Sequence, residues 1–139
     1  MFGNAIPVFP VEDVAKSVEY YLTMLGFKLN WGGQDGQLAS VTRGRCTIFL
    51  CEGDQGHAGT WTWIGVPDAE VLFAELKAKG AKIRHPPTNY FWALKMQVED
   101  LDGNVLRLGS DPKLGEPHGE WLDMQGRVWP PQKAPSRRT

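Results

Sequence analysis

Two tryptophans, Trp61 and Trp63, stand two positions apart in the segment TWTWIGV, whose composition is typical of a β-strand. Alternate residues of a strand point to the same face of its sheet, so both indole rings belong on one side. An indole has a flat apolar body and an N–H donor, and several of them together suit the stacking of a flat ligand. Packing in the core, the usual role of strand aromatics in a small protein, is the alternative that stays open for each of these two residues.

Further aromatic residues extend the candidate binding set. The chain has six tryptophans in 139 residues, and core packing alone explains so many poorly. The predicted ligand-binding residues are Trp31, Phe49, Trp61, Trp63, Tyr90, Phe91, Trp92 and Arg107. On the same face as the rings, Arg107 favours a neutral or anionic ligand over a cationic one. An outward position on the solvent face of its strand is the alternative for this arginine.

The spacing of the other reactive side chains predicts no catalytic group. His57 lies in a glycine-rich linker, His85 precedes two prolines, and His118 falls in the C-terminal part of the chain. Neither a Ser/His/Asp or Cys/His arrangement nor a glycine-rich phosphate loop can be recognised. Cys46 and Cys51 lie five residues apart in one predicted strand, which places them about 16 Å apart on opposite faces, beyond the reach of a disulfide.

Composition and charge exclude several classes of partner. The net charge is −1, and residues 1–111 carry 10 Lys and Arg against 13 Asp and Glu, so no basic surface for a nucleic acid or an anionic membrane is expected. No apolar run approaches the roughly 18 residues of a membrane span, and the N-terminus lacks the pattern of a secretion signal. We therefore expect a cytoplasmic protein with neither nucleic acid nor membrane as its partner.

Two similar segments position the candidate residues: VEDVAKSVEYYLTMLGFKLNW and VPDAEVLFAELKAKGAKIRHP. In each, an aspartate (Asp13 or Asp68) is placed to cap the N-terminus of an amphipathic helix. A glycine (Gly26 or Gly80) follows 13 or 12 residues later and predicts the end of that helix. The chain therefore contains an internal repeat.

Three strands are predicted after the helix-capping signal in each half, and one before it. The second half contains LDG, a strong hairpin signal, between two of them. Each half thus has the order β-α-β-β-β, and the predicted class is α+β, with two βαβββ repeats forming a curved mixed sheet around a funnel-shaped cavity. The units are expected at residues 4–53 and 60–111 of one compact domain. Residues 112–139 are expected to be a partly disordered C-terminal tail.

The segments AIPVFPVEDVAKSVEYYLTMLGF, CTIFLCEG, TWTWIGV and VEDLDGNVLRLG carry a family resemblance. Together they resemble the vicinal oxygen chelate superfamily, which includes glyoxalase I, extradiol dioxygenases and bleomycin-resistance proteins, and the match is closest to the last of these. The resemblance covers residues 4–110. It implies that each unit curls its sheet into half a funnel, and that the protein forms a homodimer whose second subunit often completes the cavities.

Enzymes of this superfamily hold a divalent metal with His and Glu or Gln side chains inside the funnel. The resemblance places the four ligand positions at Ile6, Ile48, Trp61 and Arg107, with Ile48 taken from a gapless overlay of the two units. None of these side chains can ligate a divalent cation. We therefore expect neither a metal nor another cofactor at this site.

The resemblance and the aromatic set together predict a non-catalytic binding or sequestration protein of the bleomycin-resistance type, acting as a homodimer in antibiotic resistance. Its expected ligand is a planar or amphipathic small molecule, of which a bleomycin-type antibiotic is one example. The alternative is a lyase or isomerase of the same superfamily with a displaced or metal-free site. A third reading is a regulatory or scaffold module that uses GEWLDMQGRVW in the tail as a partner motif.

Overall fold

The computed structural model describes residues 3–34 and 36–119, which form two helices and eight strands. The strands form two four-stranded sheets: sheet A, in the order β1-β4-β3-β2, and sheet B, in the order β5-β8-β7-β6. The elements, in chain order, are β1 (Val8–Pro10), α1 (Val14–Thr23), β2 (Lys28–Gly32), β3 (Leu38–Arg43), β4 (Cys46–Cys51), β5 (Trp61–Gly65), α2 (Ala69–Lys79), β6 (Lys82–Asn89), β7 (Leu94–Glu99) and β8 (Val105–Ser110).

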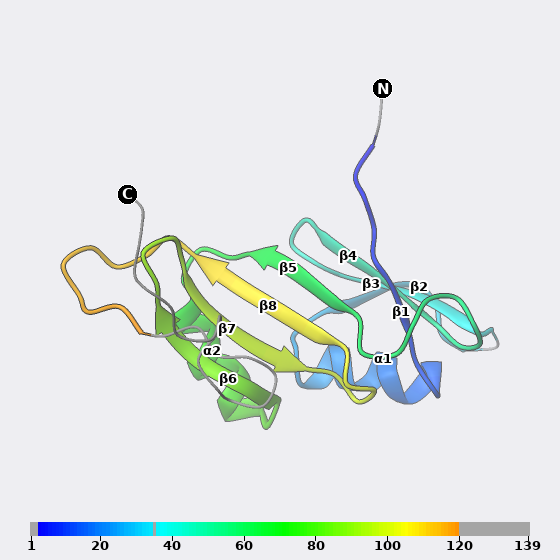
Figure 1. Cartoon of the computed structure of the whole chain (residues 1–139). Helices are drawn as coiled ribbons and strands as arrows, with labels where there is room; N and C mark the ends of the chain where they lie inside the picture. The colour runs from blue at the N-terminus through cyan, green and yellow to red at the C-terminus, as the bar shows by residue number, and fades with distance from the viewer. Residues whose placement is uncertain (1–2, 35, 120–139) are drawn as a thin grey trace.

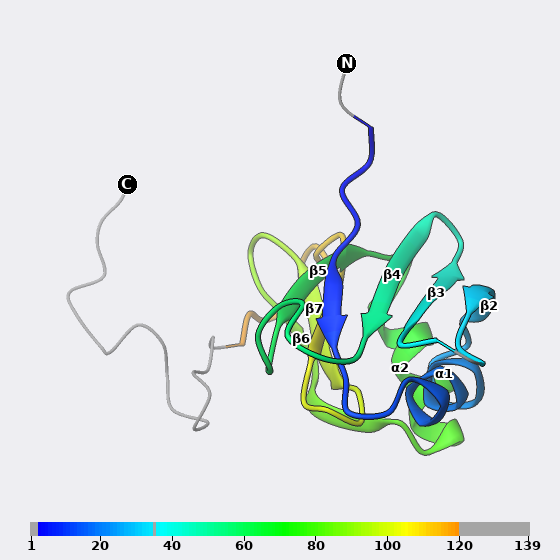
Figure 2. The same cartoon turned by 90° about the vertical axis from the view of Figure 1, so that its right-hand side faces the viewer.

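Each sheet with its helix is one βαβββ unit, so the predicted α+β repeat is confirmed. In both units the first strand runs parallel to the last, β1 beside β4 and β5 beside β8, and the other neighbours are antiparallel. The two open sheets are separate within the chain and do not join into one continuous sheet. Figure 1 shows the strands of sheet B side by side, and Figure 2 shows those of sheet A.

Both helices begin at the aspartates that the sequence predicts. The carboxylates of Asp13 and Asp68 accept hydrogen bonds from backbone N–H groups of the first helical turns. Helix α2 ends at Lys79 and is capped by Gly80, whose φ of 88° is left-handed. Helix α1 ends earlier, at Thr23, and Gly26 adopts a φ of 75° in the turn that leads into β2.

One hydrophobic core joins the two units. Its buried side chains come from both helices and from the helix-facing sides of both sheets, including Phe9, Ile48, Leu76, Met96 and Leu106. Both helices lie in the lower half of the molecule in the two views (Figures 1 and 2). This core occupies one face of each sheet, and the opposite faces carry the exposed aromatic residues Trp31 and Trp63.

Polar groups also connect the two units, where α1 and β1 meet the turn between β7 and β8. The Tyr21 hydroxyl on α1 donates to the Asp100 carboxylate at 2.9 Å, and Asn104 donates to the Pro10 carbonyl at 3.0 Å. Asp100 and Asn104 are almost completely buried and belong to the turn between β7 and β8. The D-x-D-G-N segment therefore holds the two units together as well as forming a turn.

No helix in the described ranges is long and apolar enough to cross a membrane.

Cys46 and Cys51 are free thiols, as their spacing in one strand predicts. The C-terminal part of the predicted tail, with most of the proposed partner motif, lies outside the described residues.

Candidate functional site

Trp61 and Trp63 lie on the face of sheet B that points away from helix α2. Their neighbour Ile64 packs against the hydrophobic core, and so does Leu108 on the adjacent strand β8. Since strand side chains alternate between faces, Trp61, Trp63 and Arg107 share the opposite side, and Arg107 is paired with Trp63 in the ladder. The aromatic face, as we call this side of the sheet, comprises Trp61, Trp63, Arg84, Tyr90, Trp92, Lys95 and Arg107.

Two arginines contact the indole rings of β5. The guanidinium carbon of Arg107 is 5.8 Å from the centroid of the Trp61 ring and 5.7 Å from that of the Trp63 ring. A second guanidinium carbon, that of Arg84, is 5.2 Å from the Trp61 centroid. These distances are typical of cation–π contacts, in which the ring stabilises the cation while part of its surface is withdrawn from water.

Tyr90 and Trp92, in the turn between β6 and β7, continue the row of rings. Their centroids are 5.5 Å apart with planes at 16°, and Trp92 is 5.9 Å from Trp63. The Lys95 ammonium is 5.2 Å from the Tyr90 centroid and 5.4 Å from the Trp92 centroid. Trp63 is 46% exposed and Trp92 is 37% exposed. Two rings of the row are therefore accessible to a ligand.

The electrostatics of the aromatic face are dominated by Lys95 and Arg107. Lys95 is fully buried, and this burial, followed by the positive charge of Arg107, lowers the pKa of Lys95 to about 8. Arg84 instead forms an ion pair with Glu99 at 3.1 Å and donates to Gln97 at 3.0 Å. The middle of the face thus combines stacked rings with two neighbouring positive groups.

Sequence reasoning missed Lys95 and Arg84. A signal for Lys95 was present, because it alternates with Leu94 and Met96 in β7, and both of these neighbours are buried. Alternation places Lys95 on the face opposite the core, where an ammonium group can be expected to find electron-rich partners. Its ring partners could not be identified from the strand alone, because they come from the preceding turn.

The structure divides the predicted site residues between the two sheets. Trp31 and Phe49 lie on sheet A, where their ring centroids are 5.3 Å apart. Phe91 is 78% exposed in the turn between β6 and β7. The other predicted residues, Trp61, Trp63, Tyr90, Trp92 and Arg107, belong to the aromatic face of sheet B.

Strand pairing corrects one of the four positions implied for metal ligands. Val8 is opposite Phe49 in sheet A in the same way that Trp63 is opposite Arg107 in sheet B. Phe49 is therefore the counterpart of Arg107, whereas Ile48 is buried in the core. The gapless overlay was wrong by one residue because the turns that precede these two strands differ in length.

The corrected set does not fit a divalent metal any better. Its side chains, Ile6, Phe49, Trp61 and Arg107, provide no carboxylate, imidazole or thiolate ligand. Across residues 3–34 and 36–119, no group of three or more His, Cys, Asp and Glu side chains is arranged to hold a metal ion. The metal implied by the family resemblance therefore has no ligand set at its usual positions.

A hollow of about 540 Å³ opens at one end of the aromatic face. It is bordered by Trp63, Trp92, Gly109 and Asp111, among others. A Cβ atom on Gly109 would overlap the Trp63 ring, so the indole lies directly against the backbone of β8 at this point. The hollow has a size that small ligands commonly fill.

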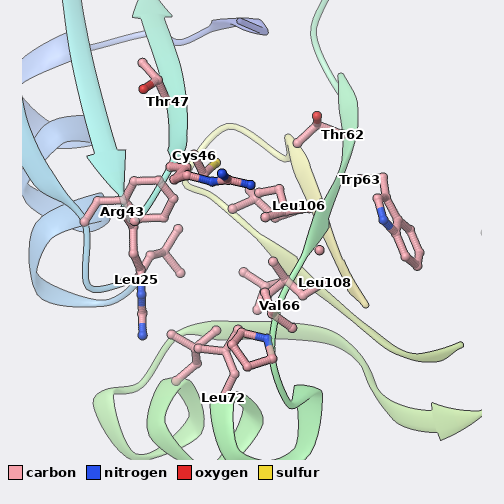
Figure 3. A pocket seen from close by; sticks show the side chains of 18 of the residues that line it. Leu25, Arg43, Cys46, Thr47, Thr62, Trp63, Val66, Leu72, Leu106 and Leu108 are labelled. Carbon is pink, nitrogen blue, oxygen red and sulfur yellow. The ribbon is translucent and has the colours of Figure 1, made fainter. Parts of the chain in front are cut away.

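A larger cavity, of about 1160 Å³, lies on the other side of β5, between the two units. Figure 3 shows Leu72, Leu106 and Leu108 around it; Trp63 is also part of the border, but its indole ring lies on the far side of β5. At its border Arg43 already donates to Glu75, with two hydrogen bonds of 2.9 Å. The lining is continuous with the hydrophobic core. This cavity is an uncovered part of the core, and Arg43 and Glu75 at its border are already paired with each other, so we place the candidate site on the aromatic face.

Comparison with known proteins places this geometry in a family. The model of the Glyoxalase/Bleomycin resistance protein/Dioxygenase superfamily matches residues 6–108. A comparison with curated proteins finds no significant match.

Several solved structures are similar to this chain. TioX from Micromonospora sp. ML1 is 19% identical, with a TM-score of 0.69, over 78% of this chain and 99% of TioX. The bleomycin-binding protein from bleomycin-producing Streptomyces verticillus, complexed with copper(II)-bleomycin, is 23% identical, with a TM-score of 0.63, over 79% of this chain and 97% of that protein. A glyoxalase/bleomycin resistance protein/dioxygenase from Nocardioides is 17% identical, with a TM-score of 0.64, over 86% and 90% of the two chains. At these identities the likeness shows the fold.

Proposed function

The chain belongs to the glyoxalase/bleomycin resistance protein/dioxygenase superfamily, and from this membership we propose that it binds and sequesters a planar small molecule without catalysing its conversion. The aromatic face of sheet B is the proposed binding surface. The observation that carries the proposal is the continuous row of rings in which Trp63 and Trp92 are accessible beside a hollow of about 540 Å³. Stacking on such rings needs a flat partner and no particular hydrogen-bond pattern.

The residue types at the superfamily's ligand positions support binding over metal-dependent catalysis. A Lewis-acid site needs several oxygen or nitrogen donors that converge on one point. No such metal-binding donors are present among the side chains at the superfamily's ligand positions, which are Ile6, Phe49, Trp61 and Arg107. Cys46, a thiol at the border of the larger cavity, has a pKa that is raised by burial, which disfavours the nucleophilic thiolate.

A bleomycin-type antibiotic is one candidate ligand, since the Streptomyces verticillus protein is complexed with copper(II)-bleomycin. A role in antibiotic resistance is proposed on the same ground. Arg107 and Lys95 distinguish the site proposed here, because positive groups on the binding surface disfavour a cationic ligand. The test panel therefore has to include neutral and anionic planar compounds beside bleomycin.

We also propose that the chain forms a homodimer. Val8, Trp31 and Leu38 are large apolar residues on sheet A that are each at least 36% exposed. Phe9 and Val41 on the same strands are buried in the core, so Val8 and Leu38 lie on the side of sheet A away from α1. Exposed apolar residues that gather on one face are typical of a protein interface. A second copy that covers this face would bring Trp31 and Phe49 into a shared pocket.

Fluorescence titration tests the proposed function. Bleomycin and a panel of planar compounds of differing charge are added to the full chain, and intrinsic tryptophan emission is followed. We expect saturable quenching by at least one compound, with affinity reduced about tenfold or more in Trp63→Ala, because one large stacking surface is lost. Phe73→Leu is the matched control, since it replaces an aromatic residue on α2 and leaves the aromatic face intact.

Two outcomes would count against this function. The absence of saturable binding across the panel would remove its basis. Stoichiometric metal in the purified protein, found by elemental analysis and accompanied by turnover of a substrate, would favour the alternative of an enzyme with a displaced site.

A further inference from the structure

Part of the aromatic face is buried, although it lies on the side of sheet B away from the core. Lys95 and Gln97 alternate in β7 with core residues, so their side chains point to the outer side of the sheet. Lys95 is 0% exposed, Gln97 is 5% exposed, and Tyr90 in the adjacent turn is 4% exposed. The buried patch, as we call these three residues, includes a lysine, a residue type that is almost never fully buried unless it is paired.

Several interactions converge on the buried patch. The Lys95 ammonium is 5.2 Å from the Tyr90 centroid and 5.4 Å from the Trp92 centroid. Tyr90, Trp92, Lys95 and Arg107 each take part in at least one further interaction. These four residues come from one turn and two strands and share the aromatic face. A group that lies over the patch would contact several of them at once.

The C-terminal part of the chain returns to this surface at Gly119. Asn89, at the end of β6, accepts from the Lys113 N–H group at 2.8 Å through its side-chain oxygen and donates to the Lys113 carbonyl at 3.0 Å. The Gly119 N–H group then donates to the Asn89 backbone carbonyl at 2.8 Å. Since Tyr90 directly follows Asn89, the chain continues from Gly119 beside the turn that carries Tyr90 and Trp92.

The residues that follow have a composition that suits an aromatic surface with positive groups. Residues 120–129 read EWLDMQGRVW, with two tryptophans, three other large apolar residues and the carboxylates of Glu120 and Asp123. Residues 130–139 read PPQKAPSRRT and lack large apolar side chains. Ten extended residues span about 33 Å, whereas four strands about 4.8 Å apart span about 14 Å. Residues 120–129 are therefore long enough to cross the whole sheet.

From these observations we propose that the buried patch is the docking surface for residues 120–129 of the same chain. Apolar side chains of this segment pack against Tyr90 and Trp92, and its carboxylates lie on the side of the positive groups of Lys95 and Arg107. A tethered segment needs little affinity of its own, because its effective concentration at the patch is high. The apolar motif of the C-terminal part thus has sheet B of its own chain as its partner.

This docking is independent of the proposed function, but it limits the surface that a ligand can use. Trp63 is 46% exposed and borders the hollow of about 540 Å³. The Trp63 end of the aromatic face therefore remains open to a planar ligand, whereas the segment occupies the Lys95 end.

Nuclear Overhauser effects in the full chain test the docking without any variant. We expect contacts between the indole protons of Trp121 or Trp129 and the ring protons of Tyr90 or Trp92, because packed rings have centroids about 4.5–7 Å apart. The absence of any contact between residues 120–129 and the aromatic face would overturn the proposal. An equal mixture of isotope-labelled and unlabelled chains shows which chain supplies the segment. Contacts between the two kinds of chain would assign it to a second copy and would overturn docking within the same chain.

Acetylation of lysines measures how well the patch is covered. The pKa of Lys95 is about 8, so near pH 8 much of its amine is unprotonated and reacts once the reagent reaches it. Mass spectrometry compares the labelling of Lys95 with that of the exposed Lys77 on α2. We expect the double change Trp121→Ser and Leu122→Ser to raise this ratio about fivefold, the equivalent of one lost aromatic contact.

Leu114→Ser is the matched control, since Leu114 is 93% exposed and precedes the docking segment. It should leave the labelling ratio at the value of the parent. An equal ratio in the control and in the double variant would contradict the docking, and thermal unfolding shows whether both are folded. Neither measurement uses a ligand, so the docking and the proposed small-molecule binding stand or fall separately.

Discussion

At the scale of single residues, the absence of a side chain at Gly109 determines where the Trp63 ring can lie. Gly109 is paired with Gly65 between β8 and β5, and a Cβ atom on Gly109 would overlap the Trp63 indole. A Cβ atom on Gly65 would meet nothing within 4 Å. The same glycine-to-alanine change on two paired residues should therefore displace the Trp63 ring in one case and leave it in place in the other.

We expect Gly109→Ala to displace the Trp63 ring and to weaken the binding of a planar ligand about three- to tenfold, the value of one lost aromatic contact. Gly65→Ala, at a residue that also borders the hollow, should weaken binding less, because its Cβ atom would leave the Trp63 ring in place. Tryptophan fluorescence titration measures both variants, and thermal unfolding shows whether each is folded. Equal affinities for the two variants would contradict the position assigned to Trp63.

At the scale of elements, helix α1 connects the two units through adjacent tyrosines. The Tyr21 hydroxyl donates to Asp100 at 2.9 Å in a buried environment. The Tyr20 hydroxyl donates to the Glu99 carbonyl and accepts from the Lys82 N–H group, both at 2.9 Å. Burial, and then the negative charge of Asp100, raises the pKa of Tyr21, so its hydroxyl remains a donor at neutral pH. The Y-Y pair of the family resemblance thus has a structural role.

Removal of the two hydroxyls should have unequal effects on stability. Tyr21→Phe leaves the buried Asp100 carboxylate with one donor fewer, and we expect a loss of about 1–3 kcal/mol in the free energy of unfolding. Tyr20→Phe should cost less than about 1 kcal/mol, because its partners lie nearer to solvent and can bind water. Urea denaturation of the two variants measures the difference, and a larger loss for Tyr20→Phe would contradict this account.

At the scale of the whole molecule, two open sheets share one core, and several large apolar residues are exposed on the other side of each sheet. Sheet A exposes Val8, Trp31 and Leu38, β5 of sheet B exposes Trp63, and the turn between β6 and β7 exposes Trp92. The open cavity of about 1160 Å³ between the units is a further uncovered apolar surface. Of these surfaces, the exposed face of sheet A is the physical basis for the proposed homodimer.

A charge placed on the outer face of sheet A should separate the proposed dimer. We expect the parent to sediment as a dimer and Val8→Glu to sediment as a monomer at the same concentration, because a carboxylate buried in an apolar interface is strongly unfavourable. Leu114→Glu is the matched control, since Leu114 is 93% exposed in a segment outside the sheets. A monomeric parent would contradict the proposed dimer directly.

The sequence by itself determined the local structure of this protein. The capping aspartates, the glycine at the end of α2 and the alternation of Trp61 and Trp63 all depend on neighbours a few residues apart, so their patterns could be recognised directly. The internal repeat then predicted two βαβββ units. The residue types at Ile6, Trp61 and Arg107 were likewise sufficient to predict that the superfamily's metal ligands are replaced.

Only the tertiary structure decided which residues meet. Phe49 replaced Ile48 as the counterpart of Arg107 because register depends on turn length, and a shift of one residue moves a side chain to the other face of the sheet. Lys95 joined the site through rings in the turn between β6 and β7, and Trp31 and Phe49 were assigned to another sheet. Such contacts join separate strands or turns through the pairing and packing of the sheets, and local periodicity carries no information about them.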